Sequence, residues 1–181
     1  MNGGISIVIP VLDEARGIEA ALIALRPLRA QGVEVVVVDG GSRDTTRSLA
    51  EPHCDRLVDA PRGRGAQMNA GARAARGEIL VFLHADTGIP DDGPRALREG
   101  LERSGRAWGR FDVAIGAGGS SLLAFVAAMM NIRSRLTGIA TGDQAIFARR
   151  AAFDAVGGFP EIALMEDIEL CKRLKDRKSV V

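Results

Sequence analysis

Residues 33–42 read VEVVVVDGGS and give the clearest indication of the fold. A run of consecutive valines without polar alternation is typical of a strand that is buried on both faces. Two further runs have the same character, ISIVI at residues 5–9 and EILVFL at residues 78–83. Because such strands occur in parallel sheets that helices cover on each side, these runs predict a parallel sheet.

Segments with helical character alternate with these strands. They lie at residues 15–25, 44–50 and 66–75, and a weaker strand is predicted at residues 56–58, before the third helix. Repeated strand–helix–strand units imply right-handed crossovers. The predicted fold class is therefore α/β, with a Rossmann-like, mostly parallel sheet and helices on both faces.

The second half of the chain is less regular, but elements can still be assigned along it. The predictions are a helix from Pro94 to Arg103, a strand from Trp108 to Ile115, a helix from Ser120 to Leu136, a strand from Ala145 to Ala148, a helix from Arg150 to Val156, a turn at residues 157–160 and a final helix that opens at Met165. No internal repeat or low-complexity linker divides the chain. Residues 1–181 are therefore predicted to form a single domain.

Composition bounds the classes of protein that need to be considered. The chain is 46% hydrophobic and 26% charged, which is ordinary for a globular domain. Its net charge of +1 gives no global electrostatic case for a nucleic-acid partner. The two cysteines suggest neither a disulfide framework nor a zinc site. There is no secretion signal, and the weakly polar stretch at residues 117–130 is too short to span a membrane, so a cytoplasmic protein is expected.

Polar residues follow each predicted parallel strand. Pro10 and Glu14 follow the first strand, residues 39–44 follow the second, and His84, Ala85 and Asp86 end the third. Because ligands of such sheets bind beyond the carboxyl ends of the strands, these loops are expected to converge on one site. The structural alternative is that Asp39 and Asp44 shape a turn and cap a helix.

Glycine-rich segments invite a phosphate-binding interpretation, but two common motifs are absent. No Gly-Lys pair exists to form a P-loop, and the segment that begins at Gly63 has Met68 where a dinucleotide fingerprint needs its third glycine. Arg62 to Gly65 nevertheless open a helix, where guanidinium groups and free backbone N–H groups favour an anion. Asn69, one turn further on, either lines a pocket or faces solvent.

Two further pairs of residues are candidates for chemistry. If the chain stays extended after the third strand, His84 and Asp86 leave the same side and can meet one divalent cation, Mg²⁺ or Mn²⁺, which a diphosphate would complete. Alternatively, His84 only forms hydrogen bonds. Glu166 and Asp167 open the last helix, where they either stabilise the helix dipole or include a general base.

In order and spacing, these motifs resemble family 2 glycosyltransferases of the GT-A fold. The matching segments are IVIP at 7–10 with Glu14, VVVDGGS at 36–42, RGAQMNAG at 64–71, FLHAD at 82–86, GDQ at 142–144, GGFP at 157–160 and EDIEL at 166–170. More narrowly, the segments DGGS, FLHAD, WGRF, GDQA and MEDIE resemble a bacterial subgroup described as radical-SAM/selenodomain-associated transferases.

The resemblance implies an inverting transfer of a sugar from a nucleotide-diphosphate-sugar to an acceptor hydroxyl, assisted by a divalent cation, and it implies roles for particular residues. Pro10, Glu14, Asp39, Arg64, Asn69 and Ala85 would bind the donor, His84 and Asp86 the metal, and Asp143 and Gln144 the acceptor, with Asp167 as general base and Glu166 beside it. Two departures stand out. His84 replaces the first acid of the family's Asp-x-Asp motif, and the chain ends at Val181, where family members usually continue.

Other functions fit parts of the same pattern. A nucleotidyltransferase also binds nucleotide and metal beyond its strand ends, and a nucleotide-sugar-binding protein without catalysis would tolerate His84. A peripheral contact with the inner face of the membrane is a further hypothesis, because apolar residues 122–130 precede Arg133 and Arg135. Core packing or a homodimer contact explains that stretch more simply.

Overall fold

The computed structural model describes residues 4–113, 121–140, 144–162 and 164–176. Six strands form one sheet in the order β3-β2-β1-β4-β6-β5. Their bounds are β1 Ile5–Val11, β2 Glu34–Asp39, β3 Arg56–Asp59, β4 Ile79–Phe82, β5 Trp108–Arg110 and β6 Ile146–Arg149. The first four strands are parallel, and β6 and β5 continue the sheet in antiparallel pairings. The predicted mostly parallel sheet is confirmed.

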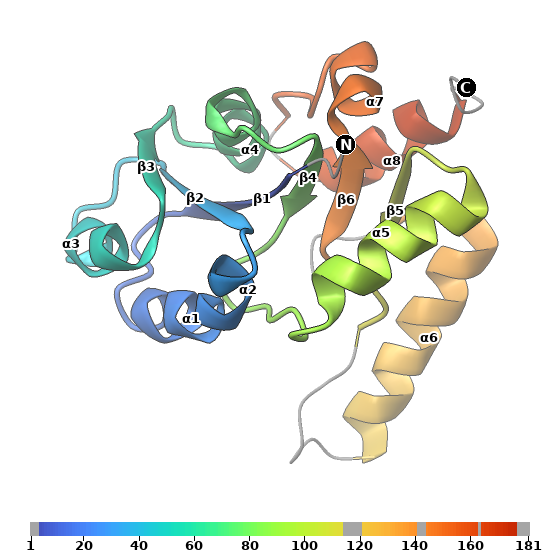
Figure 1. The fold of residues 1–181 in the computed structure, drawn as a ribbon, viewed down its shortest axis with the longest axis horizontal. Helices are drawn as coiled ribbons and strands as arrows, with labels where there is room; N and C mark the ends of the chain where they lie inside the picture. The colour runs from blue at the N-terminus through green and yellow to red at the C-terminus, as the bar shows by residue number, and fades with distance from the viewer. Residues whose placement is uncertain (1–3, 114–120, 141–143, 163, 177–181) are drawn as a thin grey trace.

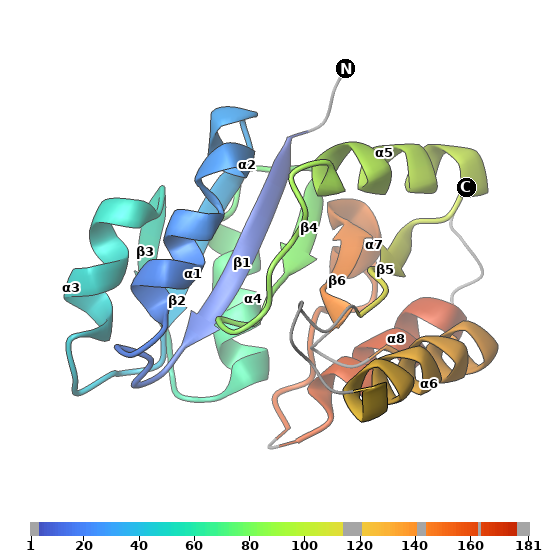
Figure 2. The same ribbon diagram turned by 90° about the horizontal axis from the view of Figure 1, so that it is seen from below.

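Helices cover both faces of this sheet (Figures 1 and 2). In Figure 1 the helices α1 Ile18–Ala24, α2 Arg26–Ala30 and α5 Gly93–Ser104 lie below the sheet. The helices α4 Arg64–Ala74 and α7 Arg150–Ala155 lie above it. The remaining helices are α3 Thr46–Ala50, the short 3₁₀ helix Glu51–His53, α6 Ser121–Thr137 and α8 Glu166–Asp176.

The two faces of β2 explain why its valines do not alternate with polar residues. Val35 and Val37 pack in one core cluster with leucines of α1, α2 and α5. Val36 and Val38 pack in a second cluster with side chains of α4, α7 and α8. All four valines are fully buried, so each face of the strand needs an apolar residue at every position.

Two predicted elements differ from the observed ones by more than two residues at one end. The predicted helix at residues 15–25 begins only at Ile18, and it is followed by the separate helix α2, whose first turn holds Pro27, a residue without an N–H group. The predicted strand from Trp108 ends at Arg110, and Ala114 and Ile115 lie outside the described residues. After β5 the backbone of Val113 instead pairs with the Asn131 side chain of α6, through hydrogen bonds of 2.9 Å in both directions.

The contact of α4 with the sheet depends on a glycine. A Cβ atom at Gly71 would lie 2.3 Å from Cγ1 of Val8 and 2.8 Å from Cγ2 of Val38. We therefore expect Gly71→Ala to lower the free energy of unfolding by about 1–3 kcal/mol, because overpacking displaces the helix from the strands. Gly100→Ala in α5 is the matched control, since its Cβ would meet no atom within 4 Å. In urea unfolding, equal stability of the two variants would contradict this close packing.

Candidate active site

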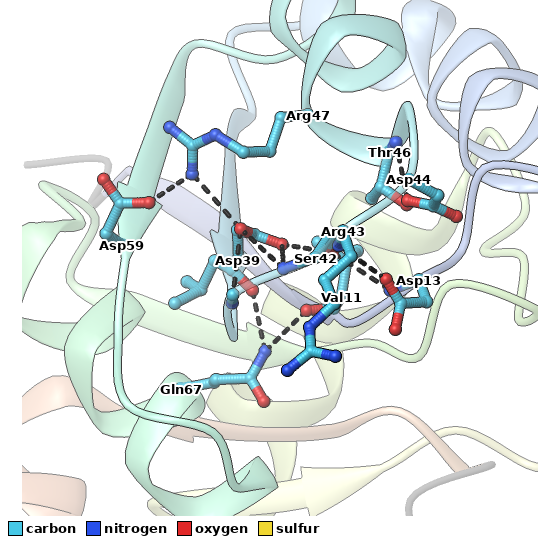
Figure 3. Close-up of polar contacts among 12 residues, drawn as sticks. Val11, Asp13, Asp39, Ser42, Arg43, Asp44, Thr46, Arg47, Asp59 and Gln67 are labelled. Atoms are coloured by element: carbon cyan, nitrogen blue, oxygen red, sulfur yellow. Dashed lines mark hydrogen bonds and ion pairs between the residues drawn. The ribbon is translucent and has the colours of Figure 1, made fainter.

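The loop after β1 and the loop after β2 are joined into one rigid edge of the sheet (Figure 3). Backbone N–H groups of one loop donate to side-chain oxygens of the other: Asp13 N to Ser42 Oγ at 3.0 Å, Glu14 N to Thr46 Oγ1 at 2.7 Å, Ala15 N to Asp44 Oδ2 at 3.2 Å and Arg43 N to Asp13 Oδ1 at 2.7 Å. Asp44 therefore shapes this turn, as the structural alternative for it predicted.

Asp39, at the end of β2, is 2% exposed and holds the same loop from inside. Its carboxylate accepts hydrogen bonds from the backbone N–H and the hydroxyl of Ser42 and from the N–H of Gly41, and it forms an ion pair with Arg47 at 3.2 Å. Burial by itself raises the pKa of Asp39, but the bonds from Ser42, Arg47 and Gly41 outweigh burial and hold that pKa below its usual value. The carboxylate is therefore ionised and fixed at neutral pH.

Asp39→Asn is expected to lower the free energy of unfolding by about 1–3 kcal/mol at neutral pH, because an amide is a poorer acceptor for these donors. Because the pKa of Asp39 is lower in the folded than in the unfolded state, its carboxylate stabilises the fold at pH values above the unfolded-state pKa of about 4. This stabilisation is lost as the pH falls through the folded-state pKa. The gap between wild type and variant should therefore narrow below about pH 4. Urea unfolding of both proteins over a range of pH tests this prediction. The control is Asp59→Asn, because Asp59 is the exposed ion-pair partner of Arg47. A gap that does not change with pH would contradict it.

Gln67 binds the ends of the neighbouring strands β1 and β2, a role that the sequence analysis missed. Its side chain is 4% exposed, and Nε2 donates to the carbonyl oxygens of Val11 and Val38, each at 2.9 Å. The signal was its spacing, since Gln67 lies four residues before Gly71, on the face of α4 that packs on the sheet. Figure 3 shows its amide between the two strand ends. Gln67 also lines the cleft described next.

A cleft of about 340 Å³ opens at this edge of the sheet. It brings together six of the predicted site residues, Pro10, Glu14, Arg64, His84, Ala85 and Asp86. Val11, Leu12, Arg62, Gly63 and Gln67 complete its wall. Loops that follow β1 and β4 thus meet the N-terminus of α4, as expected for ligand sites beyond the carboxyl ends of parallel strands.

The segment that carries His84 and Asp86 is not extended, so the condition stated for their meeting one cation is not fulfilled. The strand β4 ends at Phe82, and the N–H of Thr87 donates to the carbonyl oxygen of His84 at 3.1 Å, which closes a turn. Both residues still line the cleft. Within the described residues no three His, Cys, Asp or Glu side chains gather into a metal-binding group. A cation held by His84 and Asp86 would therefore need further oxygen ligands from its substrate or water.

Asn69 lies outside this cleft. Its Nδ2 donates to the carbonyl oxygen of Phe159 at 2.9 Å, and its Oδ1 accepts from the N–H of Phe159 at the same distance. A Cβ atom at Gly158 would lie 2.6 Å from Oδ1, so this turn is shaped around the asparagine. Asn69 thereby connects α4 to the Gly157–Pro160 turn that precedes α8.

Of the predicted acceptor-side and catalytic residues, the three that the structure describes, Gln144, Glu166 and Asp167, do not line the cleft. Glu166 and Asp167 open α8, where Glu166 is 4% exposed and Asp167 Oδ1 accepts from the N–H of Ile168 at 2.7 Å. Gln144 is 1% exposed and donates to Ser134 Oγ at 2.9 Å, which ties the start of β6 to α6. Asp143 lies outside the described residues.

The doubly wound sheet, with a cleft of arginines, acids and a histidine at its strand ends, defines an α/β domain of the GT-A type. The chain belongs to glycosyl transferase family 2, because the sequence model of that family matches residues 6–156.

Individual relatives agree with this assignment. An uncharacterized glycosyltransferase of Nostoc sp. is 35% identical over 89 residues, which cover 45% of this chain and 28% of the relative. A mannosyltransferase of Pyrobaculum calidifontis, solved with GDP-Man and Mn²⁺, superposes with a TM-score of 0.75 at 24% identity, over 94% of this chain and 51% of that one. TarS of S. aureus, solved with UDP-GlcNAc, gives a TM-score of 0.72 at 18% identity, over 94% of this chain and 53% of that one. The aligned region spans about a quarter of the curated relative and half of each solved structure, and the structural likeness concerns the fold.

Proposed function

We propose that this domain transfers a sugar from a nucleotide-diphosphate-sugar to an acceptor hydroxyl, with inversion at the anomeric carbon and with the help of a divalent cation. The observation that carries the proposal is the cleft, which gathers Arg62, Arg64, His84 and Asp86 around one volume. Relatives of the same fold solved with Mn²⁺ and GDP-Man or with UDP-GlcNAc support the class of donor.

The cleft residues suit such a donor chemically. Arg62, Arg64 and the N-terminus of α4 favour the negative charge of a diphosphate. His84 and Asp86 would hold the cation, and a nitrogen ligand beside a carboxylate favours Mn²⁺ over Mg²⁺. When bound, the cation would offset the charge that develops on the leaving diphosphate. Pro10, Glu14 and Ala85 line the same volume, where they would contact the nucleotide.

The remaining assignments follow the family resemblance. Asp167 takes the proton of the acceptor hydroxyl, with Glu166 beside it, and Asp143 and Gln144 lie on the acceptor side. Asp39 acts on the nucleotide through the loop that it holds, and Asn69 acts through the Phe159 turn. We assign residues 1–181 to one domain, and its motifs favour the radical-SAM/selenodomain-associated subgroup.

The location and partners of the protein are also proposals. Within the part of the chain that the structure describes, no helix is long and apolar enough to cross a membrane. We propose a cytoplasmic protein that does not bind nucleic acid. Its α6 surface serves either the inner face of the membrane or a homodimer.

A thermal-shift screen tests the donor and the metal together. UDP-glucose, UDP-GlcNAc and GDP-mannose are each added with Mn²⁺, with Mg²⁺ or with EDTA. At about 100 times its Kd, the correct donor should add about 2.7 kcal/mol, a rise in Tm of roughly 5–10 °C that EDTA reduces. Arg64→Ala should remove the rise in Tm that the donor causes. The control is Arg95→Ala, which changes an exposed arginine of α5 and should keep the rise in Tm.

Three outcomes would contradict the proposal. A wild-type chain that no nucleotide-sugar stabilises with either metal would contradict the donor class. Release of pyrophosphate from a nucleoside triphosphate would identify a nucleotidyltransferase. Tight donor binding without transfer or hydrolysis would identify a binding protein.

A further inference from the structure

The surface of α6 exposes large apolar side chains along the length of the helix that is described. Their exposed fractions are 63% for Phe125, 42% for Val126, 49% for Met129, 49% for Ile132 and 82% for Leu136. We name these five residues the α6 apolar stripe. Core packing, the simpler explanation of this stretch, does not hold for them.

The stripe points away from the domain. Phe125, Met129, Ile132 and Leu136 follow the spacing of one helical face, whereas Ala127 and Ser134, on the opposite face, are 5% and 4% exposed. In Figure 1, α6 extends further down than any other labelled helix. In Figure 2, which shows the molecule from below, α6 lies in front of α8 at the lower right edge of the view. A continuous apolar face on a projecting helix indicates a contact surface.

The surroundings of the stripe carry positive charge. The helix α6 contains no Asp or Glu, and Arg133 is exposed on it. Asp112 is bound by both Arg110 and Arg135, so this group of three keeps one positive charge. Lys175 of α8 reaches the C-terminal end of α6, where its Nζ donates to the carbonyl oxygen of Thr137 at 2.8 Å.

These charges distinguish between two possible occupants. If the helices α6 of two copies packed together, Arg133 would be buried beside an apolar stripe, and neither helix has a carboxylate to pair with it. An anionic lipid surface offers phosphate to the arginines, and their long side chains can reach it while the apolar residues enter the boundary of the acyl chains. With 17 residues, α6 suits a position along such a surface rather than across it.

We propose that α6 binds the surface of an anionic lipid bilayer, with the apolar stripe inserted between headgroups and with Arg133, Arg135 and Lys175 facing lipid phosphates. The proposal does not rest on the transferase activity. The proposed partner is lipid, and the proposed contact surface is the described part of α6.

Flotation with vesicles tests this proposal. One vesicle preparation contains phosphatidylcholine alone, and the other contains phosphatidylcholine with about one third phosphatidylglycerol. The wild-type chain should float with the anionic vesicles and not with the neutral ones, and added salt should reduce the bound fraction. The double variant Met129→Ser/Ile132→Ser should partition at least about tenfold more weakly, because it removes two inserted side chains.

Arg133→Glu should also weaken binding to the anionic vesicles, whereas Ile23→Ser is the control. Ile23 is 43% exposed on α1, so its replacement removes an exposed apolar side chain at another place. Circular dichroism verifies that each variant is folded. The thermal shift caused by a nucleotide-sugar is measured on the same preparations, so the proposed function is tested separately.

Three results would overturn the proposal. The first is a wild-type chain that does not float with anionic vesicles. The second is equal binding to neutral and anionic vesicles, which would remove the role of the arginines. The third is a dimer in sedimentation experiments that Met129→Ser/Ile132→Ser dissociates, because the stripe would then be covered by a second copy.

Discussion

Asp167→Asn is expected to lower the rate of sugar transfer by about 10²–10⁴-fold while donor binding is retained. A general base contributes a factor of this size, and an amide cannot accept the proton of the acceptor hydroxyl. Asp167 lies in the first turn of α8, outside the walls of the donor cleft. The loss should therefore appear in kcat, and the thermal shift caused by the donor should stay that of the wild type.

The matched control is Glu169→Gln. Glu169 lies on the same helix, and its replacement also removes one negative charge. Its carboxylate forms ion pairs with Lys172 and Arg173. The rate of sugar transfer is measured from the nucleoside diphosphate that is released. A rate for Asp167→Asn within a few fold of the control would show that another group takes the proton.

Gln67→Glu is expected to lower the free energy of unfolding by about 2–4 kcal/mol at neutral pH. The change keeps the size of the side chain, but it replaces the amide donor with a buried carboxylate that faces the carbonyl oxygens of Val11 and Val38. Because repulsion separates the two strand ends, the donor cleft should widen and the thermal shift caused by the donor should decrease.

The effect of Gln67→Glu should depend on pH. Burial and the two carbonyl oxygens raise the folded-state pKa of the introduced carboxyl group above its unfolded value of about 4.3. The destabilisation therefore grows as the pH rises above the unfolded value, and it should shrink toward about pH 4. Gln67→Met is the control, since it removes the amide without adding charge and should cost about 1–2 kcal/mol at every pH. If both variants lost the same free energy of unfolding at every pH, the role of the two carbonyl oxygens would be contradicted.

Much of the fold could be predicted because its signals are local. Valines at residues 35–38 require apolar surroundings on both faces, and the polar residues after each strand mark the ligand edge whatever the details of packing. The cleft residues Pro10, Glu14, Arg64, His84, Ala85 and Asp86 were all predicted from their places after strands or at a helix start.

Other features depend on distant partners that sequence order does not reveal. Gln67 was recognised as part of a motif, but its contacts with Val11 and Val38 require α4 to lie across both strands. Asn69 has suitable chemistry for a ligand, yet Phe159, 90 residues away, takes both of its polar atoms. The spacing of apolar residues in α6 predicted a helix without showing which face the domain would leave uncovered.

Periodicity and loop composition are properties of neighbouring residues, so they suffice to predict a doubly wound sheet with a polar edge. Three features could be seen only in the folded chain: Asp39 holds its own loop, the segment of His84 turns instead of extending, and α6 exposes an apolar stripe. The physical reason is that hydrogen bonds and burial depend on which residues are neighbours in the folded chain. For these residues the neighbours belong to other elements or are brought close by a turn in the backbone.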